Sequence, residues 1–404
     1  MALLPVAEAL DLVLRDALPL PAELVPLCHA HGRVLAKGLS ALRTQPPADV
    51  SAMDGYAVRA EEVAQAPVSL KLVGAVAAGR PFAGMVRQGE AARIFTGGVM
   101  PEGADTVVIQ EHTRREADAV VVTQATGKGR NVRPKGLDFA CGADLLPQGQ
   151  RLTDRDLALA AAMNHSTVPV HRQPRVAVFA TGDELVMPGS NPGPGEIVHS
   201  NGYATMALAR HEGGDILDLG IVPDRLDETV AAVRRARHSG ADILVTSGGA
   251  SVGDYDLVQQ ALAGEGLKLS FWKIAMRPGR PMLNGRLGSM HVLGVPGNPV
   301  SAYVCSFLFL VPLIRRLAGR TDLVRVPEQA VLGSDLPAND ERADYLRATL
   351  ASGPDGLVAT PHPIQDSSML APLARADCLL IREPFAPAAH PGSTCSILRL
   401  APRA

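Results

Sequence analysis

The sequence predicts a multidomain protein of α/β plus β class, with a doubly wound, mostly parallel α/β domain at its centre. Its 404 residues exceed the length of one ordinary domain. Between residues 173 and 325, buried apolar runs alternate with helical segments, which is the pattern of a parallel sheet with helical crossovers. On both sides of this region, short β-like runs alternate with turns, in keeping with the 39 glycines and 32 prolines of the chain.

The strands expected in the α/β domain (residues 173–325) are short and apolar, as strands buried on both faces are. They are Arg175–Ala180, Asp215–Leu219, Ile243–Ser247, Leu269–Ile274 and His291–Val295. The expected helices are Asn201–Glu212, Asp227–His238, Leu257–Gly264 and Val300–Leu317. Strands and helices that alternate in this order favour a doubly wound sheet.

Three further domains are expected. Residues 1–44 and 140–172 are predicted to form a discontinuous helical N-terminal domain, with helices over Val6–Leu14 and from Leu24 to Leu39, and a third that Thr153 or Asp154 caps. Residues 45–139 are predicted to form a β-rich insert. Residues 326–404 are predicted to form a small, β-barrel-like C-terminal domain.

The composition argues against several classes of protein. A net charge of −2 gives no electrostatic footprint for nucleic acid. The five cysteines are scattered and form no CxxC pair, which fits a reducing compartment better than a disulfide framework or a zinc site. No signal peptide is apparent, and the most apolar stretch, Val300–Leu313, is too short to span a bilayer and contains Pro312 near its end. We therefore expect a cytoplasmic protein that binds neither nucleic acid nor membranes.

A glycine-rich loop follows the strand Ile243–Ser247. Its small residues are Ser247, Gly248, Gly249 and Ser251. Their exposed backbone N–H groups suit a phosphate or another oxyanion, and the loop should lie beyond the carboxyl ends of the strands, where open α/β sheets bind ligands. Asp254 and Asp256 follow, and their carboxylates could hold Mg²⁺ against that anion. The alternative is a βα turn whose glycines only satisfy backbone geometry.

Acidic residues follow several of the predicted strands. The same edge of the sheet gathers Asp183, Glu184, Asp224, Asp254 and Asp256. One acidic strand end is routine, but several at one edge indicate a metal site.

The β-rich insert adds three polar residues. Asp54 lies in the turn SAMDGYAV, Thr96 follows a strand, and Asp138 ends the basic loop NVRPKGLD, which suits a phosphate with its metal. Taken alone, Asp54 has the default role of an Asx-turn residue, and the basic loop could be a solvated hairpin.

Eight motifs, taken together, resemble the molybdopterin molybdenumtransferase family, the molybdenum insertases of molybdenum cofactor synthesis, and are similar to the C-terminal domain of gephyrin. They are SAMDGYAV, FTGGVMPEGADTVV, NVRPKGLD, ATGDEL, SGGASVGDYD, FWKIAMRPGRP, GVPGNPVSA and DSSMLAPLARAD, in order over nearly the whole chain. The resemblance implies four domains and a homodimer whose active-site cleft the partner subunit completes. It also implies a Mg²⁺-dependent reaction that takes molybdate and adenylylated molybdopterin to the molybdenum cofactor and AMP, with transient contacts to the adenylylating enzyme and to apo-molybdoenzymes.

The resemblance also implies roles for particular residues. The implied catalytic residues are Asp54, Thr96, Asp138, Glu184 and Asp256, and the implied metal ligands are Glu184, Asp224 and Asp256. The implied contacts to molybdate and to the pterin phosphate are Ser247, Gly248, Gly249, Ser251, Lys273, Arg277, Arg280, Pro281, Pro296, Asn298, Ser301, Arg342 and Ser367. Where the family often has KPGKP, this chain has RPGRP, which keeps the charge but replaces a point charge by a planar fork.

Two other functions remain open at this point. The first is a non-catalytic scaffold or cofactor-binding protein on the same fold, since fold does not fix function. The second is a nucleotide hydrolase that uses the α/β domain alone. A scaffold would have no use for the acids of the sheet edge and the insert. A hydrolase would leave the basic RPGRP segment and the acids of the insert unexplained.

Overall fold

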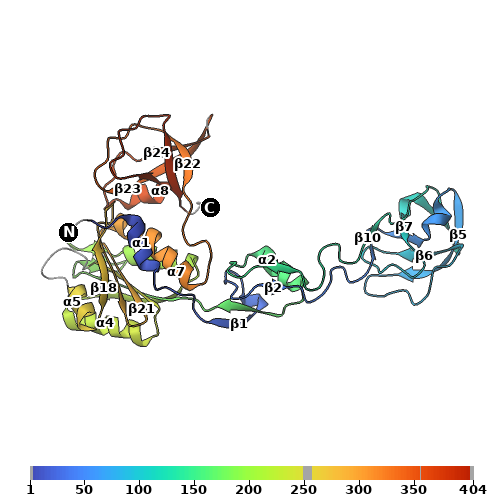
Figure 1. The fold of residues 1–404 in the computed structure, drawn as a ribbon, viewed down its shortest axis with the longest axis horizontal. Helices are drawn as coiled ribbons and strands as arrows, with labels where there is room; N and C mark the ends of the chain where they lie inside the picture. Colours follow the sequence, from blue (N-terminus) through green and yellow to red (C-terminus); the bar gives the residue numbers. More distant parts are fainter. Residues whose placement is uncertain (1–2, 249–256, 355, 401–404) are drawn as a thin grey trace.

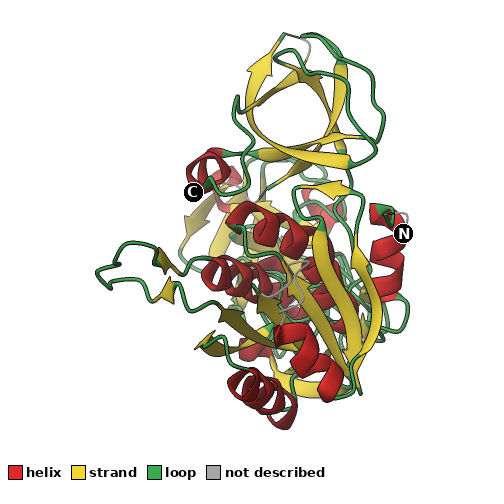
Figure 2. Ribbon diagram, turned by 90° about the vertical axis from the view of Figure 1, so that its left-hand side faces the viewer, coloured by secondary structure: helices red, strands yellow, loops and turns green. Residues whose placement is uncertain are grey.

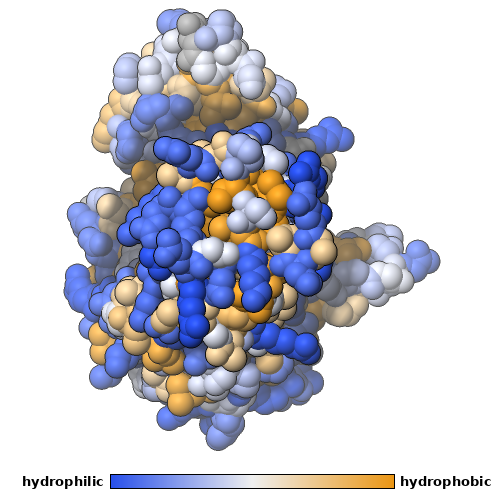
Figure 3. Space-filling model, turned by 90° about the vertical axis from the view of Figure 1, so that its right-hand side faces the viewer, coloured by the Kyte–Doolittle hydropathy of each residue, from blue (hydrophilic) through white to orange (hydrophobic). Residues whose placement is uncertain are grey.

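The computed structural model describes residues 3–248, 257–354 and 356–400. The chain is elongated and consists of four bodies (Figure 1). The α/β domain and the C-terminal β domain lie together at one end, the discontinuous domain lies in the middle, and the β-rich insert lies at the other end. Viewed from the end that carries the insert, the molecule shows an apolar patch bordered by hydrophilic residues (Figure 3). Because the insert and the α/β domain lie at opposite ends of the elongated chain in Figure 1, the insert is remote from the α/β domain of its own chain.

The α/β domain contains a six-stranded sheet in the order β16-β13-β17-β21-β20-β18. Its strands are β13 (Arg175–Thr181), β16 (Asp215–Val222), β17 (Ile243–Ser247), β18 (Lys268–Lys273), β20 (Pro281–Leu287) and β21 (Met290–Val295). Strands β16, β13, β17 and β21 are parallel neighbours, whereas β20 runs antiparallel to both β21 and β18. The mostly parallel sheet is confirmed. Strand β20 was not predicted, because proline and glycine in MRPGRPM indicate a loop where this strand begins.

Helices cover both faces of the sheet, as a doubly wound fold requires. Side chains from α3 (Asn201–His211) and from the long helix that contains α6 (Pro299–Cys305) and α7 (Val311–Leu317) share one buried cluster. Side chains from α4 (Leu226–His238) and α5 (Leu257–Gly264) share the cluster on the opposite face. The α/β prediction is therefore confirmed at the level of layers.

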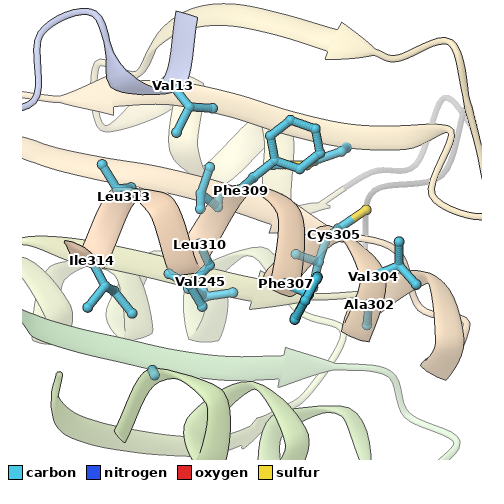
Figure 4. Packing of buried hydrophobic residues seen from close by; sticks show 14 of the residues in the cluster. Val13, Val245, Ala302, Val304, Cys305, Phe307, Phe309, Leu310, Leu313 and Ile314 are labelled. Atoms are coloured by element: carbon cyan, nitrogen blue, oxygen red, sulfur yellow. The ribbon is translucent and has the colours of Figure 1, made fainter. Parts of the chain in front are cut away.

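The helix Pro299–Leu317 is the central core element of the α/β domain. Within the described ranges it is the one helix long and apolar enough to cross a membrane, with 19 residues and a mean hydropathy of 1.6, but 83% of its most apolar window is buried inside the protein. Figure 4 shows it beside α1 (Val6–Leu14), where Val13 joins the same cluster as Phe309. The helix continues past Pro312, because a π-helical turn over Ser306–Leu310 precedes that residue and accommodates the missing N–H.

The discontinuous domain contains less helix than predicted. Its strands are β1 (Ala22–Pro26), β2 (Leu39–Ser40), β11 (Asp144–Leu146) and β12 (Thr167–His171), paired as β1 with β12 and β2 with β11. The helix predicted from Leu24 to Leu39 is wrong: Pro21 and Pro26 flank an extended segment whose backbone pairs with β12. The helix α2 (Asp154–Ala162) is present, and Thr153 caps it by a capping box with Asp156.

Helix α1 belongs with the α/β domain instead of the discontinuous domain to which residues 1–44 were assigned. Its buried residues Ala9 and Val13 pack in the cluster of the long core helix. The backbone of the segment before it also joins the α/β domain, since the Leu4 N–H donates to the Lys273 carbonyl at 3.3 Å. The pattern of Val6–Leu14 predicts the helix but not the surface against which its apolar face packs.

The insert is a six-stranded sheet in the order β7-β4-β6-β5-β9-β8. Its strands are β4 (Gly55–Val58), β5 (Val68–Val76), β6 (Glu90–Ile94), β7 (Thr106–Ile109), β8 (Thr113–Glu116) and β9 (Ala119–Val122), and the short strands β3 (Val50–Ser51) and β10 (Val132–Arg133) pair where the insert joins the discontinuous domain. Two buried clusters fill it, so it has a core of its own, as a β-rich domain should.

The C-terminal domain is a closed five-stranded barrel. Its strands are β22 (Glu328–Leu332), β23 (Ala343–Gly353), β24 (Gly356–Pro361), β25 (Cys378–Arg382) and β26 (Thr394–Arg399). Pairing of β23 with β25 closes the ring that is visible in Figure 2. The barrel-like prediction is confirmed. The helix α8 (Leu370–Arg375) was not predicted, and the two-residue strand β19 (Met276–Arg277) of the α/β domain adds to the edge of the barrel.

Candidate functional site

A cavity of about 850 Å³ lies at the carboxyl ends of β13, β17 and β21. Strand β13 lies between β16 and β17, which are consecutive strands in the chain, so the cavity opens where the chain crosses the sheet. Open α/β sheets bind ligands at such points. Of the residues expected in the site, those that line the cavity are Glu184, Asp224, Ser247, Gly248, Pro281, Pro296, Asn298 and Ser301. The structure thus gathers eight predicted residues in one place.

The floor of the cavity is polar and rigid. Ser247, which is 4% exposed, ends β17 and accepts a hydrogen bond from Asn201 Nδ2 at 2.9 Å. The same amide donates to the Gly297 carbonyl at 2.7 Å, so it joins the ends of β17 and β21. Gly248 has φ +91°, and a Cβ there would lie 2.5 Å from the Thr181 carbonyl oxygen. Only glycine fits this position, which allows a ligand to approach the backbone closely.

Residues of the cavity that sequence reasoning missed come mostly from one segment. Thr181, His199, Ser200, Asn201 and Ser368 line the cavity and were not expected there. Burial lowers the pKa of His199, whose ring packs near Tyr203, so this side of the cavity favours a neutral imidazole. The signal available in the sequence was weak: Ser200 and Asn201 come directly before a predicted helix, where polar residues usually act as caps.

Acidic residues form one rim of the cavity. The Asp224 N–H donates to Asp183 Oδ1 at 3.0 Å. This hydrogen bond links the segment that follows β16 to the segment that follows β13. A Cβ on Gly182 would lie 2.6 Å from Glu184 Oε2, which shows that the Glu184 carboxylate folds back over this glycine. Burial, together with the charges of Asp183 and Glu184, raises the pKa of Asp224. These carboxylates repel one another and attract a cation.

The acidic rim fits Mg²⁺ in its chemistry. In the described part of the chain, no three Asp, Glu, His or Cys side chains enclose a metal position. However, Mg²⁺ keeps several waters and is commonly held by one or two carboxylates together with substrate phosphates. Arg225, the arginine next to Asp224, pairs with Asp227 and Glu228, which leaves the rim acids without its charge. Glu184 and Asp224 therefore supply suitable oxygen ligands.

Asp224→Asn is expected to raise the thermal midpoint slightly at pH 7 while it weakens Mg²⁺ binding. The raised pKa means that the folded protein binds more protons than the unfolded chain, so ionised Asp224 costs stability that is recovered as the pH falls through its pKa. The gain should stay below about 1 kcal/mol, because solvent screens exposed carboxylates. Thermal unfolding between pH 7 and pH 4 measures it.

Asp227→Asn is the matched control for this prediction. Its hydrogen bond with Arg225 lowers the pKa of Asp227, so its ionised form stabilises the fold and the change should lower the thermal midpoint. A thermal midpoint that falls in both variants at pH 7 would contradict the conclusion that ionised Asp224 costs stability.

The C-terminal domain reaches the cavity through the segment 362–369. Asn298 Nδ2 donates to Ser367 Oγ at 2.8 Å, and the Val300 N–H donates to the Ser367 carbonyl at 3.0 Å. Ser367 thus contacts the lining residue Asn298 and the backbone of Val300, which precedes the lining residue Ser301, and its role in an anion pocket remains a prediction.

Arg347 holds this segment, and sequence reasoning missed it. It is 1% exposed and donates to Gln365 Oε1 at 3.1 Å and to the Met369 carbonyl at 3.0 Å. Gln365 Nε2 returns a hydrogen bond to the Arg347 carbonyl at 3.0 Å. A buried arginine is expensive unless its donors are satisfied, so this network fixes the backbone that carries Ser367.

None of the four predicted cations lines the cavity. Arg277 pairs with Asp344 and Asp340, and Arg342 also pairs with Asp340. Lys273 lies exposed, with its ammonium 5.8 Å from the ring centre of Trp272. Arg280 is exposed beside the lining residue Pro281, and none of the ion pairs found in the described ranges involves it. The anion-binding roles of these residues remain predictions. The roles of Gly249 and Ser251 in anion binding and of Asp256 in catalysis and metal binding also remain predictions, because these three residues lie outside the described residues.

Asp54 and Thr96 form a second, separate polar site in the insert. Asp54 Oδ1 accepts hydrogen bonds from the Thr96 N–H at 2.7 Å and from Thr96 Oγ1 at 2.8 Å. These bonds, together with the nearby charge of Arg93, lower the pKa of Asp54. Within the turn itself, it is Ser51 Oγ that donates to the Met53 carbonyl at 2.5 Å. Asp54 thus joins two turns that are distant in sequence instead of serving as a local Asx-turn residue.

The insert and the cavity lie at opposite ends of one chain (Figure 1). Asp54 and Thr96 are in the insert, and Asp138 is exposed in the segment that leads back from it. None of the three lines the cavity. A single chain therefore does not bring the acids of the two domains together.

The fold and the cavity define a multidomain protein with a small-molecule site on a doubly wound domain. Three family models match it: the MoeA N-terminal region (domain I and II) over residues 4–164, a probable molybdopterin binding domain over 177–316, and the MoeA C-terminal region (domain IV) over 329–400. The chain is 43% identical to a molybdopterin molybdenumtransferase of Nostoc over 74% of its length and 70% of the relative, and 34% identical to that of Haemophilus influenzae over 91% and 92%.

Solved structures agree with these matches over the whole chain. A crystal structure of a molybdopterin biosynthesis MoeA protein from Pyrococcus horikoshii superposes with a TM-score of 0.84, at 30% identity, over 98% of this chain and 99% of that one. The chain belongs to the molybdopterin molybdenumtransferase family. It is a transferase of molybdenum cofactor biosynthesis, as the resemblance of its motifs implied.

Proposed function

We propose that this protein transfers molybdenum from molybdate to adenylylated molybdopterin, with Mg²⁺, and releases AMP. The observation that carries the proposal is the cavity at the strand ends, which combines three kinds of group. Backbone groups and Ser247 line its floor, and carboxylates form one rim. Ser301 and Pro281 also line it, and Pro281 directly follows the exposed Arg280 of the RPGRP loop. A phosphate, a divalent cation and a tetrahedral oxyanion each find a suitable partner there.

The chain's own residues would bind and orient the reactants. Gly248 and Ser247 would hold a phosphate against the strand ends, because a backbone without a Cβ allows close approach. Arg280, Ser301 and Ser367 would hold molybdate by a positive charge and two hydroxyl donors. Glu184 and Asp224 would hold Mg²⁺, which offsets the charge of the phosphoanhydride and polarises it. No protein nucleophile is needed: water would attack the phosphoanhydride and release AMP. The two dithiolene sulfurs would replace two oxygens of the molybdate placed beside them, and these oxygens would take up the thiol protons and two solvent protons and leave as water, with no change in the oxidation state of molybdenum.

The proposed active unit is a homodimer. Asp54, Thr96 and Asp138 lie too far from the cavity of their own chain to act in it, but a second copy related by two-fold symmetry could place its insert over that cavity (Figure 1). The same proposal includes a cytoplasmic location and transient contacts with the adenylylating enzyme and with apo-molybdoenzymes that receive the cofactor.

Release of AMP tests the proposed reaction. The protein is incubated with adenylylated molybdopterin and Mg²⁺, with and without molybdate. We expect AMP release that depends on molybdate. Release that is indifferent to molybdate would instead support a hydrolase, and no release would support a scaffold; either result contradicts the proposal.

Arg280→Gln is expected to raise the KM for molybdate by about tenfold or more, because it removes a charged hydrogen bond to the anion. The KM for adenylylated molybdopterin should change much less. Arg375→Gln is the matched control, since Arg375 is exposed on α8 and does not line the cavity. Equal increases in both KM values in Arg280→Gln would contradict the assigned role.

A further inference from the structure

The RPGRP loop, residues 277–281, is fixed to the C-terminal domain as well as to its own sheet. The short strand β19 pairs in parallel with β23, with Met276 opposite Ala343 and Arg277 opposite Asp344. The Ala343 N–H donates to the Ala275 carbonyl at 2.9 Å. Pro281, which begins β20 at the end of the loop, lines the cavity. The position of the loop at the cavity therefore depends on how the two domains meet.

The guanidinium of Arg277 uses four of its five N–H donors at this junction. Nε donates to Asp344 Oδ1 at 2.8 Å, and Nη2 donates to Asp344 Oδ2, so the pair is bidentate. Nη1 donates to Asp340 Oδ2 at 3.3 Å, and Nη2 also donates to Asn339 Oδ1 at 3.2 Å. The side chain of Asp344 is 7% exposed, so this carboxylate depends on its partner. A lysine would reach one oxygen of Asp344 but would not reproduce the fork.

The local charges also cancel. Two arginines, Arg277 and Arg342, face two carboxylates, Asp344 and Asp340. The hydrogen bond from Arg342, with the charge of Arg277, lowers the pKa of Asp340 to about 2, so that carboxylate stays ionised near neutral pH. A neutral cluster does not attract a dianion. Arg280, three residues along, is exposed and forms none of the ion pairs found among the described residues.

We propose that Arg277 is a positioning residue that clamps the RPGRP loop to Asp344 and Asp340 of the C-terminal domain, and that Arg280 is the residue of this loop that binds the oxyanion. The proposal rests on the proposed function for the identity of that anion. It assigns different tasks to the two arginines that stand where the family often has two lysines. The planar fork of Arg277 serves the protein junction, and the exposed charge of Arg280 serves the ligand.

The variant Asp344→Asn distinguishes a clamp by Arg277 from a direct contact between Arg277 and molybdate, because the two roles predict opposite changes in molybdate affinity. If Arg277 bound molybdate directly, Asp344 would compete with the anion, and its neutralisation would tighten binding. If Arg277 is a clamp, the same change displaces the loop and weakens binding, by between about tenfold and a hundredfold, which is the worth of one charged hydrogen bond to the anion. Titration of the full-length protein with sodium molybdate gives the Kd, and hydrogen exchange of the Ala343 amide reports whether β19 and β23 stay paired.

Four further variants are compared with Asp344→Asn. We expect Arg277→Lys, Arg277→Gln and Asp344→Asn all to weaken molybdate binding and to lose protection at Ala343, and the double variant Arg277→Gln/Asp344→Asn to be no worse than either single change. Arg399→Gln, which breaks the exposed pair with Glu328 in the same barrel, is the control and should leave both readings unchanged.

Two results would overturn the clamp. They are tighter molybdate binding in Asp344→Asn, and lost binding in Arg277→Gln with Ala343 still protected. If the wild-type protein binds no molybdate while Asp344→Asn still exposes Ala343, the proposed function fails and the clamp stands.

Discussion

Glu184→Gln is expected to abolish molybdenum transfer in a protein that remains folded. The Glu184 carboxylate lines the cavity at the end of β13 and shares the acidic rim with Asp224. Glutamine keeps the shape but loses the charge that would hold Mg²⁺. Because a bound metal typically supplies several kcal/mol of charge stabilisation, we expect the rate of molybdate-dependent AMP release to fall at least about 100-fold.

The control for this variant is Glu196→Gln. Glu196 lies in the segment between the short strands β14 (Leu185–Val186) and β15 (Ile197–Val198), is exposed and does not line the cavity. This change should leave the rate within about twofold of wild type, as expected of surface substitutions. Excess Mg²⁺ should not restore Glu184→Gln if both the charge and a ligand are lost. A folded Glu184→Gln enzyme with wild-type turnover would remove this residue from the site.

Glu212→Gln is expected to cause the largest loss of stability, about 3–5 kcal/mol, because breaking a buried ion pair leaves uncompensated charge in the core. Glu212 is 3% exposed at the end of α3 and accepts hydrogen bonds from Arg315 Nε at 2.8 Å and from Arg320 Nη1 at 2.7 Å. Arg325 lies 3.6 Å from it. Without the Glu212 carboxylate, three guanidinium groups would lie close together, and the partly exposed Asp322, which pairs with Arg320, would not compensate all of their charge. Urea unfolding measures the loss of stability, and a separate hydrogen-exchange measurement reports where α3 and α7 lose protection.

The pH dependence of stability provides an independent check on Glu212. Burial alone would raise the pKa of Glu212, but the hydrogen bond from Arg315 and the charges of the three arginines outweigh it and hold this pKa below its usual value. Its contribution is therefore complete above the unfolded pKa of glutamate and is lost as the pH falls through the folded pKa. Glu212→Gln should lack that part of the acid sensitivity. Glu228→Gln, at an exposed pair, should cost less than about 1 kcal/mol.

Local sequence pattern was sufficient for much of the fold. The α/β layers were predictable because strands buried on both faces, such as β13 and β17, are uniformly apolar. The pattern failed where distant pairing decides the structure. The Leu24–Leu39 segment has apolar residues at helical spacing, but its backbone pairs with β12. Strand β20 begins at a proline, and the contact of α1 with the long core helix depends on a surface about 300 residues away in sequence.

The candidate site was predictable where residues follow strand ends, because parallel strands end at one edge. From this rule the sequence predicted a common position for Glu184, Asp224 and Ser247, and all three line the cavity. It could not distinguish Arg277 from Arg280, since only the folded chain shows which guanidinium meets Asp344. Arg347 was missed for the same reason: its partners are carbonyl and amide oxygens of a segment about twenty residues away, and sequence motifs do not record such contacts.

In the proposed homodimer, each active site combines the insert of one copy with the cavity of the other, and a mixture of two inactive variants tests this arrangement. Asp54→Asn damages the insert and Glu184→Gln damages the cavity. In a heterodimer, one cleft would carry both changes and the other would carry neither. Random pairing makes half of the dimers mixed, and each mixed dimer has one intact cleft of two. We therefore expect about a quarter of wild-type AMP release from an equal mixture exchanged or co-expressed to equilibrium. A mixture as inactive as either variant, with mixed dimers demonstrably present, would contradict it.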